Sequence, residues 1–368
     1  MGRLTFGPGA LDGLPRLAVE LGDRRSGPPL LLAGHSANER PWLPRTRDRL
    51  PYHVFATISD SYPTWASVDR IVEIMIAHRT GPVIAMGGGS VLDTAKVAAA
   101  RAAEIDRRTR RPVAAVPTTP GTGAEVTPFA TIWDFDGVRK HSYAQHDLTP
   151  DAAIVDPDLI RTLPAGLLGS CALDALAQGM EATWSTAATP ESAAHGLAAV
   201  CLAAGNLERL LADPDDAAAR SAVCLAGLYS GQAIAVSRTT LCHALSYPLT
   251  LRYGVWHGHA CALTLGAVLS YNANVTDADC AHPAGAGQVR VLIRRILAAL
   301  RCPSLRQAAQ RIDALVAAAG LTHYRDGAYD SALVAGDALG YDRAGNNPRR
   351  FGKDQLVGLL AALEEEPS

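Results

Sequence analysis

The chain has 368 residues, enough for two domains of ordinary size. Its 34 Lys and Arg residues nearly balance its 36 Asp and Glu residues, so the formal charge is -2 and nucleic acid is not expected as a partner. Hydrophobic residues account for 48% of the chain and charged residues for 19%, a mixture typical of globular rather than disordered proteins.

Neither a membrane segment nor an export signal is evident in the sequence. The longest apolar stretches, such as residues 261–268, fall well short of the ~20 residues needed to span a bilayer. The N-terminal residues lack the apolar core of a signal peptide. We therefore expect a cytoplasmic protein that does not bind membranes.

Short apolar runs alternate with longer amphipathic stretches from the N-terminus to about residue 165. The runs at 29–33, 82–86 and 111–116 are rich in Val, Ile and Leu, as buried strands are. Strands that alternate with helices are typical of βα units. The sequence therefore predicts an α/β domain with a parallel sheet over residues 1–165.

The second half of the chain differs from the first in amino-acid composition and patterning. Long Ala- and Leu-rich segments, such as 192–211 and 217–236, follow one another with few β-branched runs. Residues 156–164 contain two prolines and a polar start, which favours a domain boundary there. We therefore expect an all-helical domain over residues 166–368.

The cysteines of the chain are odd in number and are confined to this second half. They are Cys171, Cys201, Cys224, Cys242, Cys261, Cys280 and Cys302. Because no C-x-x-C pair occurs, neither a disulfide framework nor a cysteine zinc site is expected. Most lie among Ala and Leu at helix-like spacing, where a cysteine is usually a small buried hydrophobic residue.

A glycine turn follows the apolar run at 82–86. The turn residues are Gly87, Gly88, Gly89 and Ser90, and a helical stretch comes directly after them. Without Cβ atoms, backbone N–H groups at the positive end of the helix can approach a pyrophosphate closely, and Ser90 is expected to cap the helix. An ordinary βα turn is the alternative, although it seldom needs three glycines. The turn is neither a G-x-G-x-x-G motif nor a P-loop, so alone it names no reaction.

A second passage from strand to loop runs from residue 114 to residue 127. Its hydroxyl groups include those of Thr118, Thr119 and Thr122. Because ligands of open α/β sheets bind at the carboxyl ends of strands, this loop could line the other side of a cofactor. A capped turn before a helix is the alternative.

Polar side chains of the helical half could share one metal ion. Asp174 and Gln178 lie four residues apart in a helical stretch and therefore share a face. His243 and His257 follow, and a carboxylate with two imidazoles suits Zn²⁺ or Fe²⁺ while leaving positions for a substrate oxygen. Since 11 histidines are scattered along the chain, ordinary core or surface histidines are the alternative.

The motifs occur in a fixed order along nearly the whole chain. They are Gly87-Gly-Gly-Ser-x-x-Asp93-x-x-Lys96, Pro117-Thr-Thr-x-Gly-Thr-Gly, Asp156-Pro-x-Leu, Asp174-Ala-Leu, His243 and His257-Gly. In this order they resemble the iron-containing, group III alcohol dehydrogenase family. The resemblance implies an N-terminal dinucleotide-binding α/β domain, an all-α C-terminal domain and a dehydroquinate synthase-like fold. It also implies an active site in the cleft between the domains, and it permits a homodimer by analogy.

The resemblance implies a metal site with one altered ligand. The family's ligands are an Asp, a His four residues later and two His residues fourteen apart. Asp174, His243 and His257 match this pattern, but Gln178 stands at the second position. Because an amide oxygen is a poorer donor than imidazole, we expect weakened binding of Fe²⁺ or Zn²⁺. A metal-free or weakly loaded site is the alternative.

The resemblance further implies an NAD(P)H cofactor. Its pyrophosphate would lie on the turn from Gly87 to Ser90, and Lys140 would lie near the nicotinamide ribose. The other cofactor-binding residues that it implies are Asp93, Thr118, Thr119 and Thr122. Gly34 stands where NAD-preferring relatives often have an Asp, which permits NADPH, and Arg40 could reach a 2′-phosphate.

Other stretches, among them 127–133, 237–240 and 243–250, resemble the family members that reduce phosphonoacetaldehyde to 2-hydroxyethylphosphonate in phosphonate natural-product biosynthesis. This implies a small phosphonate aldehyde as substrate, with its carbonyl polarised by the metal and hydride supplied by the cofactor. The candidate catalytic residues are His257, Lys140 and His259, and either water or His259 would supply the proton.

A phosphonate substrate needs a cation. Arg238 lies five residues before His243, so in a continuous helix its guanidinium would lie about one turn from the metal. Arg252 and Lys140 are further candidates, and ordinary surface or ion-pair arginines are the alternative. Two other functions stay open, a general alcohol or polyol dehydrogenase and a non-catalytic cofactor-binding relative.

Overall fold

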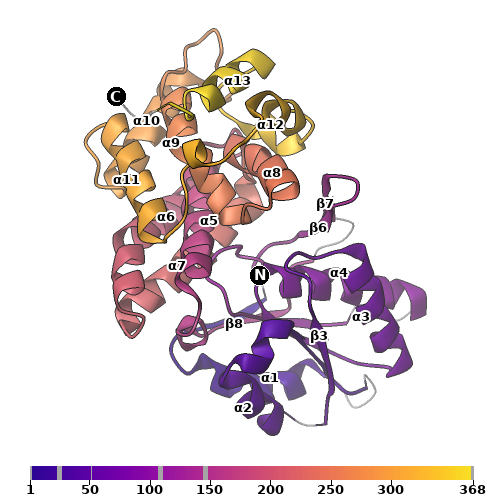
Figure 1. Ribbon diagram of the computed structural model, residues 1–368. Helices are drawn as coiled ribbons and strands as arrows, with labels where there is room; N and C mark the ends of the chain where they lie inside the picture. The colour runs from indigo at the N-terminus through magenta and orange to yellow at the C-terminus, as the bar shows by residue number, and fades with distance from the viewer. Residues whose placement is uncertain (1, 23–26, 51, 107–110, 144–147, 366–368) are drawn as a thin grey trace. The chain divides into compact units, whose positions relative to one another are not determined.

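The computed structural model describes residues 2–22, 27–50, 52–106, 111–143 and 148–365 (Figure 1). Residue contacts divide the chain into two compact units, Met1–Thr162 and Leu163–Ser368. The expected boundary after residue 165 lies three residues from this division. The first unit is an α/β unit and the second is built of helices, which confirms the predicted fold class.

A parallel sheet forms the centre of the first unit. Its strand order is β1-β8-β5-β4-β2-β3, and every pair of neighbours is parallel. The strands are β1 (Arg3–Phe6), β2 (Leu30–Gly34), β3 (Val54–Ile58), β4 (Val83–Gly87), β5 (Val113–Pro117) and β8 (Ala152–Val155). β4 and β5 are buried along their whole length, because a parallel sheet has helices on both faces and its central strands can be continuously apolar.

Helices cover the two faces of this sheet separately (Figure 1). Leu30 and Leu32 of β2 pack with α3 (Trp65–Ala77) and α4 (Gly89–Asp106). Leu31, between them, packs with α1 (Leu14–Leu21) and α2 (Trp42–Arg49), because successive strand residues point to opposite faces. The 3₁₀ helices of this unit are η1 (Ala10–Gly13), η2 (His35–Glu39) and η3 (Pro157–Ile160).

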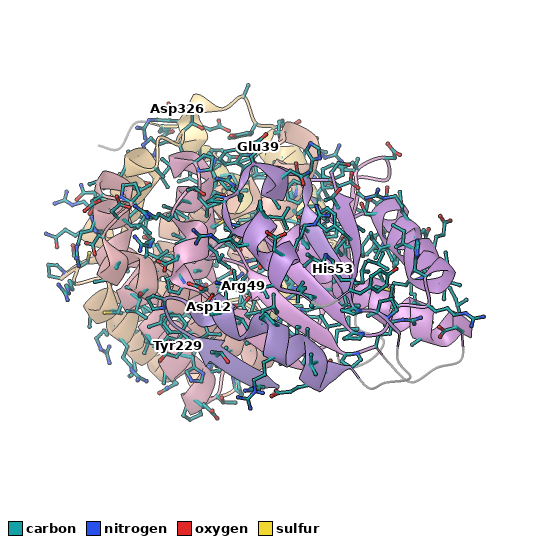
Figure 2. All side chains as sticks on the ribbon, turned by 90° about the horizontal axis from the view of Figure 1, so that it is seen from below. Asp12, Glu39, Arg49, His53, Tyr229 and Asp326 are labelled. Atoms are coloured by element: carbon teal, nitrogen blue, oxygen red, sulfur yellow. The ribbon has the colours of Figure 1, made fainter. Side chains whose placement is uncertain are left out.

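Two features lie at the edges of the first unit. β6 (Ala130–Asp134) and β7 (Arg139–Tyr143) form a separate antiparallel hairpin. On the opposite face from α3 and α4, the exposed Arg49 of α2 forms an ion pair with Asp12 of η1, and Figure 2 shows the two side chains side by side. Exposed pairs of this kind stabilise a fold by about 1 kcal/mol at most.

The second unit is organised around a central, almost entirely buried helix, α5 (Ala165–Trp184). Its other helices are α6 (Pro190–Ala212), α7 (Ala217–Ser237), α8 (Leu241–Tyr253), α9 (His257–Ala273), α10 (Gly285–Ala299), α11 (Leu305–Ala318), η4 (Tyr324–Asp326), α12 (Ser331–Ala338), η5 (Asp342–Asn346) and α13 (Lys353–Ala361). α5 contacts α6, α7 and α9. Among the residues that the structure describes, no helix has the length and apolar character needed to cross a membrane.

A glycine pair sets the distance between α5 and α6. A Cβ on Gly179 would lie 2.6 Å from the carbonyl oxygen of Gly196, and a Cβ on Gly196 would lie 2.5 Å from that of Gly179. The two backbones therefore meet directly. This close approach helps to hold α5, which carries three of the site residues described below, in a fixed position.

Candidate functional site

The glycine turn and the threonine loop of the first unit lie against each other. β4 ends at Gly87, which pairs with Pro117 at the end of β5, so the two loops leave the sheet at the same edge. A Cβ on Gly88 would lie 3.0 Å from Thr119 Oγ1, and one on Gly89 would lie 2.7 Å from Thr122 Cγ2. The glycines therefore permit close packing of the loops as well as access to the turn's backbone.

Helix α4 begins two residues earlier than the sequence predicts. It starts at Gly89, so Ser90 is the second residue of the helix, and its predicted role as N-cap is wrong. The glycines before Ser90 carry no side chain that would oppose a helical backbone, so the helix extends back to Gly89. Residues 88–90 are partly exposed, and the first N–H groups of the helix have no acceptors within it.

Asp93 and Lys96 connect α4 to the start of β6. Asp93 accepts a hydrogen bond of 2.8 Å from the Thr131 N–H, and the buried Lys96 donates to the Thr127 and Phe129 carbonyl oxygens at 3.1 and 3.0 Å. Burial raises the pKa of Asp93, against the opposing effect of Lys96. These contacts hold Asp93 against the start of β6, and its predicted role in binding the cofactor stays a prediction.

Lys140 and Gly34 also lie in the first unit. Lys140 is on β7, where its Nζ lies 3.1 Å from Ser142 Oγ, and its charge acts to lower the pKa of Asp93.

Gly34 ends β2, whose neighbour is β4, so it lies at the same edge of the sheet as the glycine turn. Arg40 donates to Thr162 Oγ1 at 3.0 Å.

Side chains from three helices of the second unit converge on one point. Asp174 of α5, His243 of α8, and His257 and Cys261 of α9 each offer a ligand atom within 4.8 Å of the other three. α9 approaches α5 closely here, because a Cβ on Gly258 would lie 2.0 Å from the Ser170 carbonyl oxygen. The structure thus brings together the three predicted residues Asp174, His243 and His257.

Two buried atoms of this group fit a cation. Asp174 Oδ1 and His243 Nε2 lie 3.3 Å apart, and within the described part of the chain neither has a hydrogen-bond partner of acceptable geometry. Buried polar atoms without a partner are costly. A divalent ion between them would satisfy both, so the donor set fits the metal that the sequence predicts.

Glu181 orients His243. Its carboxylate contacts His243 Nδ1 and accepts hydrogen bonds of 2.7 Å from Thr240 Oγ1 and the Cys242 N–H. The Nδ1 proton therefore faces Glu181, and the Nε2 lone pair faces Asp174. Carboxylate partners of this kind fix the ring and strengthen a metal-binding histidine.

The charges of the group support one another. Burial alone would raise the pKa of Asp174 and of Glu181, but the neighbouring His243 outweighs it and both pKa values lie below their ordinary range. Burial would lower the pKa of His243, yet the surrounding acids, Cys261 and Glu181 foremost, hold it well above its usual value.

His257 is oriented from its other ring nitrogen. Ser246 donates its hydroxyl to the His243 carbonyl oxygen at 2.8 Å, so its oxygen can accept from His257 Nδ1 at 3.2 Å. The Tyr247 ring stacks on the imidazole with centroids 5.7 Å apart. The His257 ring is thus held at its Nδ1 edge by Ser246 and on one face by Tyr247.

Family models of known proteins match both halves of the chain. Residues 2–157 match the model described as iron-containing alcohol dehydrogenase, and residues 170–363 match that described as Fe-containing alcohol dehydrogenase family, C-terminal. The chain belongs to the iron-containing alcohol dehydrogenase family.

Individual members of this family are similar to the chain in sequence and structure. A phosphonoacetaldehyde reductase of Streptomyces viridochromogenes is 42% identical over 348 residues, which cover 89% of this chain and 87% of that protein. A probable alcohol dehydrogenase, EutG, of Escherichia coli is 30% identical over 77% of this chain and 72% of its own length. The crystal structure of sulfoacetaldehyde reductase from Bifidobacterium kashiwanohense in complex with NAD⁺ has a TM-score of 0.87 at 26% identity, covering 100% of this chain and 98% of that one.

Gln178, at the altered ligand position of this iron-containing alcohol dehydrogenase, makes contacts on both sides of its amide. Its Oε1 lies 2.8 Å from Ser230 Oγ of α7, and its hydrogen bond to Asp174 acts to lower the pKa of that carboxyl. The amide oxygen thus faces Ser230, whereas the amide nitrogen faces Asp174.

His259 points away from His257, because residues two apart on a helix do not share a face. Its Nε2 lies 2.7 Å from the Thr322 carbonyl oxygen, which can only accept, so Nε2 carries the proton of a neutral ring. Burial lowers the pKa of His259. Its role as proton donor stays a prediction.

Arg238 lies in a break between helices, so the continuous helix assumed in predicting its position is wrong. α7 ends at Ser237 and α8 begins at Leu241. Arg238 has a φ of 61°, a left-handed value that residues other than glycine adopt only at a cost in free energy. Burial and the charge of Arg343, on η5, lower the pKa of Arg238. Arg343 Nη1 donates to Oγ1 of Thr239, the residue after Arg238, at 3.4 Å. The other candidate, Arg252, forms an ion pair of 2.6 Å with Asp337.

The sequence prediction omitted Glu181, Cys261 and Arg343. Glu181 follows Asp174 by seven residues, or two helical turns, and Cys261 follows His257 by four. Both spacings place the omitted residue on the same helix face as a predicted ligand, so the sequence could have indicated them. Arg343 lies 105 residues after Arg238, and no local pattern connects them.

The role of Glu181 can be tested with Glu181→Gln. This change keeps the size of the side chain but removes the charge that holds the His243 imidazole, and loss of such an outer partner weakens metal binding by about 10- to 100-fold. Competition with a chromogenic chelator measures the affinity. Glu191→Gln, on the exposed first turn of α6, is the matched control. Unchanged affinity in Glu181→Gln would show that Glu181 does not support the site.

Proposed function

We propose that the chain is an NAD(P)H-dependent reductase that converts phosphonoacetaldehyde to 2-hydroxyethylphosphonate with the help of a divalent metal ion. The relative that is 42% identical is a phosphonoacetaldehyde reductase, and the structural neighbour with NAD⁺ acts on sulfoacetaldehyde, another aldehyde with an anionic group. The structural observation that supports the proposal is that Arg343 contacts Thr239, the neighbour of Arg238 in the chain, in the unit that holds the candidate metal ligands.

Contacts within the second unit connect these arginines to the metal group. Arg343 Nη1 lies 3.4 Å from Thr239 Oγ1, and its charge also acts to lower the pKa of Tyr247. Tyr247 stacks on His257. Two guanidinium groups in the unit of the candidate ligands would suit a phosphonate, because each offers paired N–H donors to its oxygens.

The residues then have distinct tasks. Asp174, His243 and His257 would hold the ion, which when bound acts as a Lewis acid toward a carbonyl oxygen. Arg238 and Arg343 would hold the phosphonate and fix the orientation of the aldehyde. The backbone of residues 88–90 would bind the cofactor's pyrophosphate at the N-terminus of α4. The cofactor role of Lys140, Thr118, Thr119 and Thr122, a homodimer and a cytoplasmic location stay predictions from the sequence.

Oxidation of NADPH and NADH with a panel of aldehydes tests the proposal. We expect turnover of phosphonoacetaldehyde with a kcat/KM at least about 10-fold above that of propanal, since even one charged hydrogen bond contributes about 1.5 kcal/mol. Equal efficiency with neutral aldehydes would favour a general alcohol dehydrogenase instead. Cofactor binding without turnover of any aldehyde, with Fe²⁺ or Zn²⁺ supplied, would favour a non-catalytic relative.

Cofactor preference can be tested at Gly34. A Cβ there would lie 3.5 Å from Val91 Cγ2, which is an ordinary contact, so the backbone at this end of β2 accepts a Cβ. An Asp at the end of such a strand accepts from a ribose 2′-hydroxyl and repels a 2′-phosphate. We expect Gly34→Asp to lower kcat/KM for NADPH relative to NADH by about 10-fold or more, equivalent to 1.4 kcal/mol.

Gly34→Ala is the control for the size of the side chain and should leave the ratio of the two efficiencies unchanged. If Gly34→Asp has the same ratio as Gly34→Ala, the 2′ position of the ribose does not lie near residue 34.

A further inference from the structure

Cys261 lies on the same side of α9 as His257. The two residues are four apart in one helix, and the Cys261 side chain is completely buried. Its Sγ lies within 4.8 Å of the ligand atoms of Asp174, His243 and His257. The sequence favours a small hydrophobic residue here, but the surroundings of this thiol are polar.

We propose that Cys261 is the fourth protein ligand of the metal ion and that it compensates for the glutamine at position 178. The inference rests on the proposed function, since it assumes that this group binds a metal. A second observation supports it independently of the cysteine: Asp174 Oδ1 and His243 Nε2, both of residues about 97% buried, lack hydrogen-bond partners within the described residues and face the same point.

Gln178 is a poor candidate for the fourth ligand because its amide oxygen faces elsewhere. Oε1 lies 2.8 Å from Ser230 Oγ, and the amide nitrogen serves Asp174. Turning the amide to present its oxygen to the ion would take the N–H donor away from Asp174 and place two acceptor oxygens against each other. Ser230, which also donates to the Gly227 carbonyl oxygen at 2.9 Å, does not itself fix the amide. Gln178 is therefore a positioning residue that holds the Asp174 carboxylate.

A thiolate changes the chemistry of the site. With Cys261 the ligand set is one carboxylate, one thiolate and two neutral imidazoles, whose two negative charges balance a divalent ion. With Gln178 in its place the set carries one negative charge. Thiolate ligands favour softer ions, so we infer that the site prefers Zn²⁺ to Fe²⁺.

The spectrum of the Co²⁺-substituted protein tests this directly. Thiolate ligation to Co²⁺ produces a charge-transfer band in the near ultraviolet, which oxygen and nitrogen ligands do not produce. We expect the band when Co²⁺ is added to the full-length metal-free protein. We expect Cys261→Ser to lose the band while it retains the visible bands of bound Co²⁺. Cys224→Ser, at a buried cysteine of α7 outside the four-residue group, should keep the band.

Affinity provides a second measurement. We expect Zn²⁺ binding to weaken by about 100-fold or more in Cys261→Ser, beyond the 10- to 100-fold typical of an outer partner, whereas Gln178→Ala should keep the charge-transfer band. A wild-type protein that binds Co²⁺ without the band would overturn the assignment of Cys261 and leave the metal site itself standing. A protein that binds neither Co²⁺ nor Zn²⁺ would overturn both.

Discussion

Replacing His257 with alanine is expected to lower kcat/KM for the aldehyde by about 10³-fold or more, equivalent to about 4 kcal/mol in the barrier. His257 is the first residue of α9, and its ring is only partly buried. Removing it takes one imidazole from the group and leaves Asp174, His243 and Cys261 to hold the cation. The helix itself keeps its other contacts with α5 and α8.

The measurement pairs steady-state kinetics with the metal content of each purified variant. We expect His257→Ala to lose bound metal and to melt within a few degrees of wild type. His195→Ala, whose ring stacks on Tyr229 away from the metal group, is the control and should keep both metal and activity. If His257→Ala retained wild-type activity, His257 would not be a catalytic residue.

Arg238→Gly is expected to separate function from stability. Glycine adopts a φ of 61° without strain, whereas arginine pays roughly 1–3 kcal/mol for such a conformation. The variant should therefore melt no lower than wild type. Because it loses a charged partner of the phosphonate, we expect kcat/KM for phosphonoacetaldehyde to fall about 10- to 100-fold.

A neutral aldehyde such as propanal is the internal control and should be reduced at the wild-type rate. Arg343→Ala should show the same selective loss, whereas Arg252→Ala should affect neither substrate, because Arg252 is exposed and paired with Asp337. Equal losses for the charged and neutral aldehydes would show that Arg238 does not recognise the phosphonate. A large fall in melting temperature would mean that its role is structural.

The fold could be predicted from the sequence because its two halves bury apolar residues in different ways. The runs at 82–86 and 111–116 became the buried strands β4 and β5, and the Ala-rich segments 192–211 and 217–236 lie within α6 and α7. Continuous apolar runs of about five residues suit a strand covered on both faces, whereas longer periodic ones suit helices.

The metal group could be predicted only in part. Asp174, His243 and His257 matched a family pattern, but the contribution of Glu181 and Cys261 depends on how α5, α8 and α9 pack together. The break at Arg238 was missed because residues 237–240 contain neither glycine nor proline to mark the end of a helix. The contact of Arg343 with Thr239 at this break depends on tertiary packing, which no local pattern reveals. The predicted cleft between the domains stays a prediction.

The metal content of protein purified without chelators, followed by activity during stepwise removal and return of the ion, tests the central claim most directly. We predict one divalent ion per chain, activity toward phosphonoacetaldehyde that falls in proportion to the ion removed, and recovery when Zn²⁺ or Fe²⁺ is returned. Full activity in protein that contains no metal would contradict the assignment of Asp174, His243 and His257 as ligands of a catalytic ion.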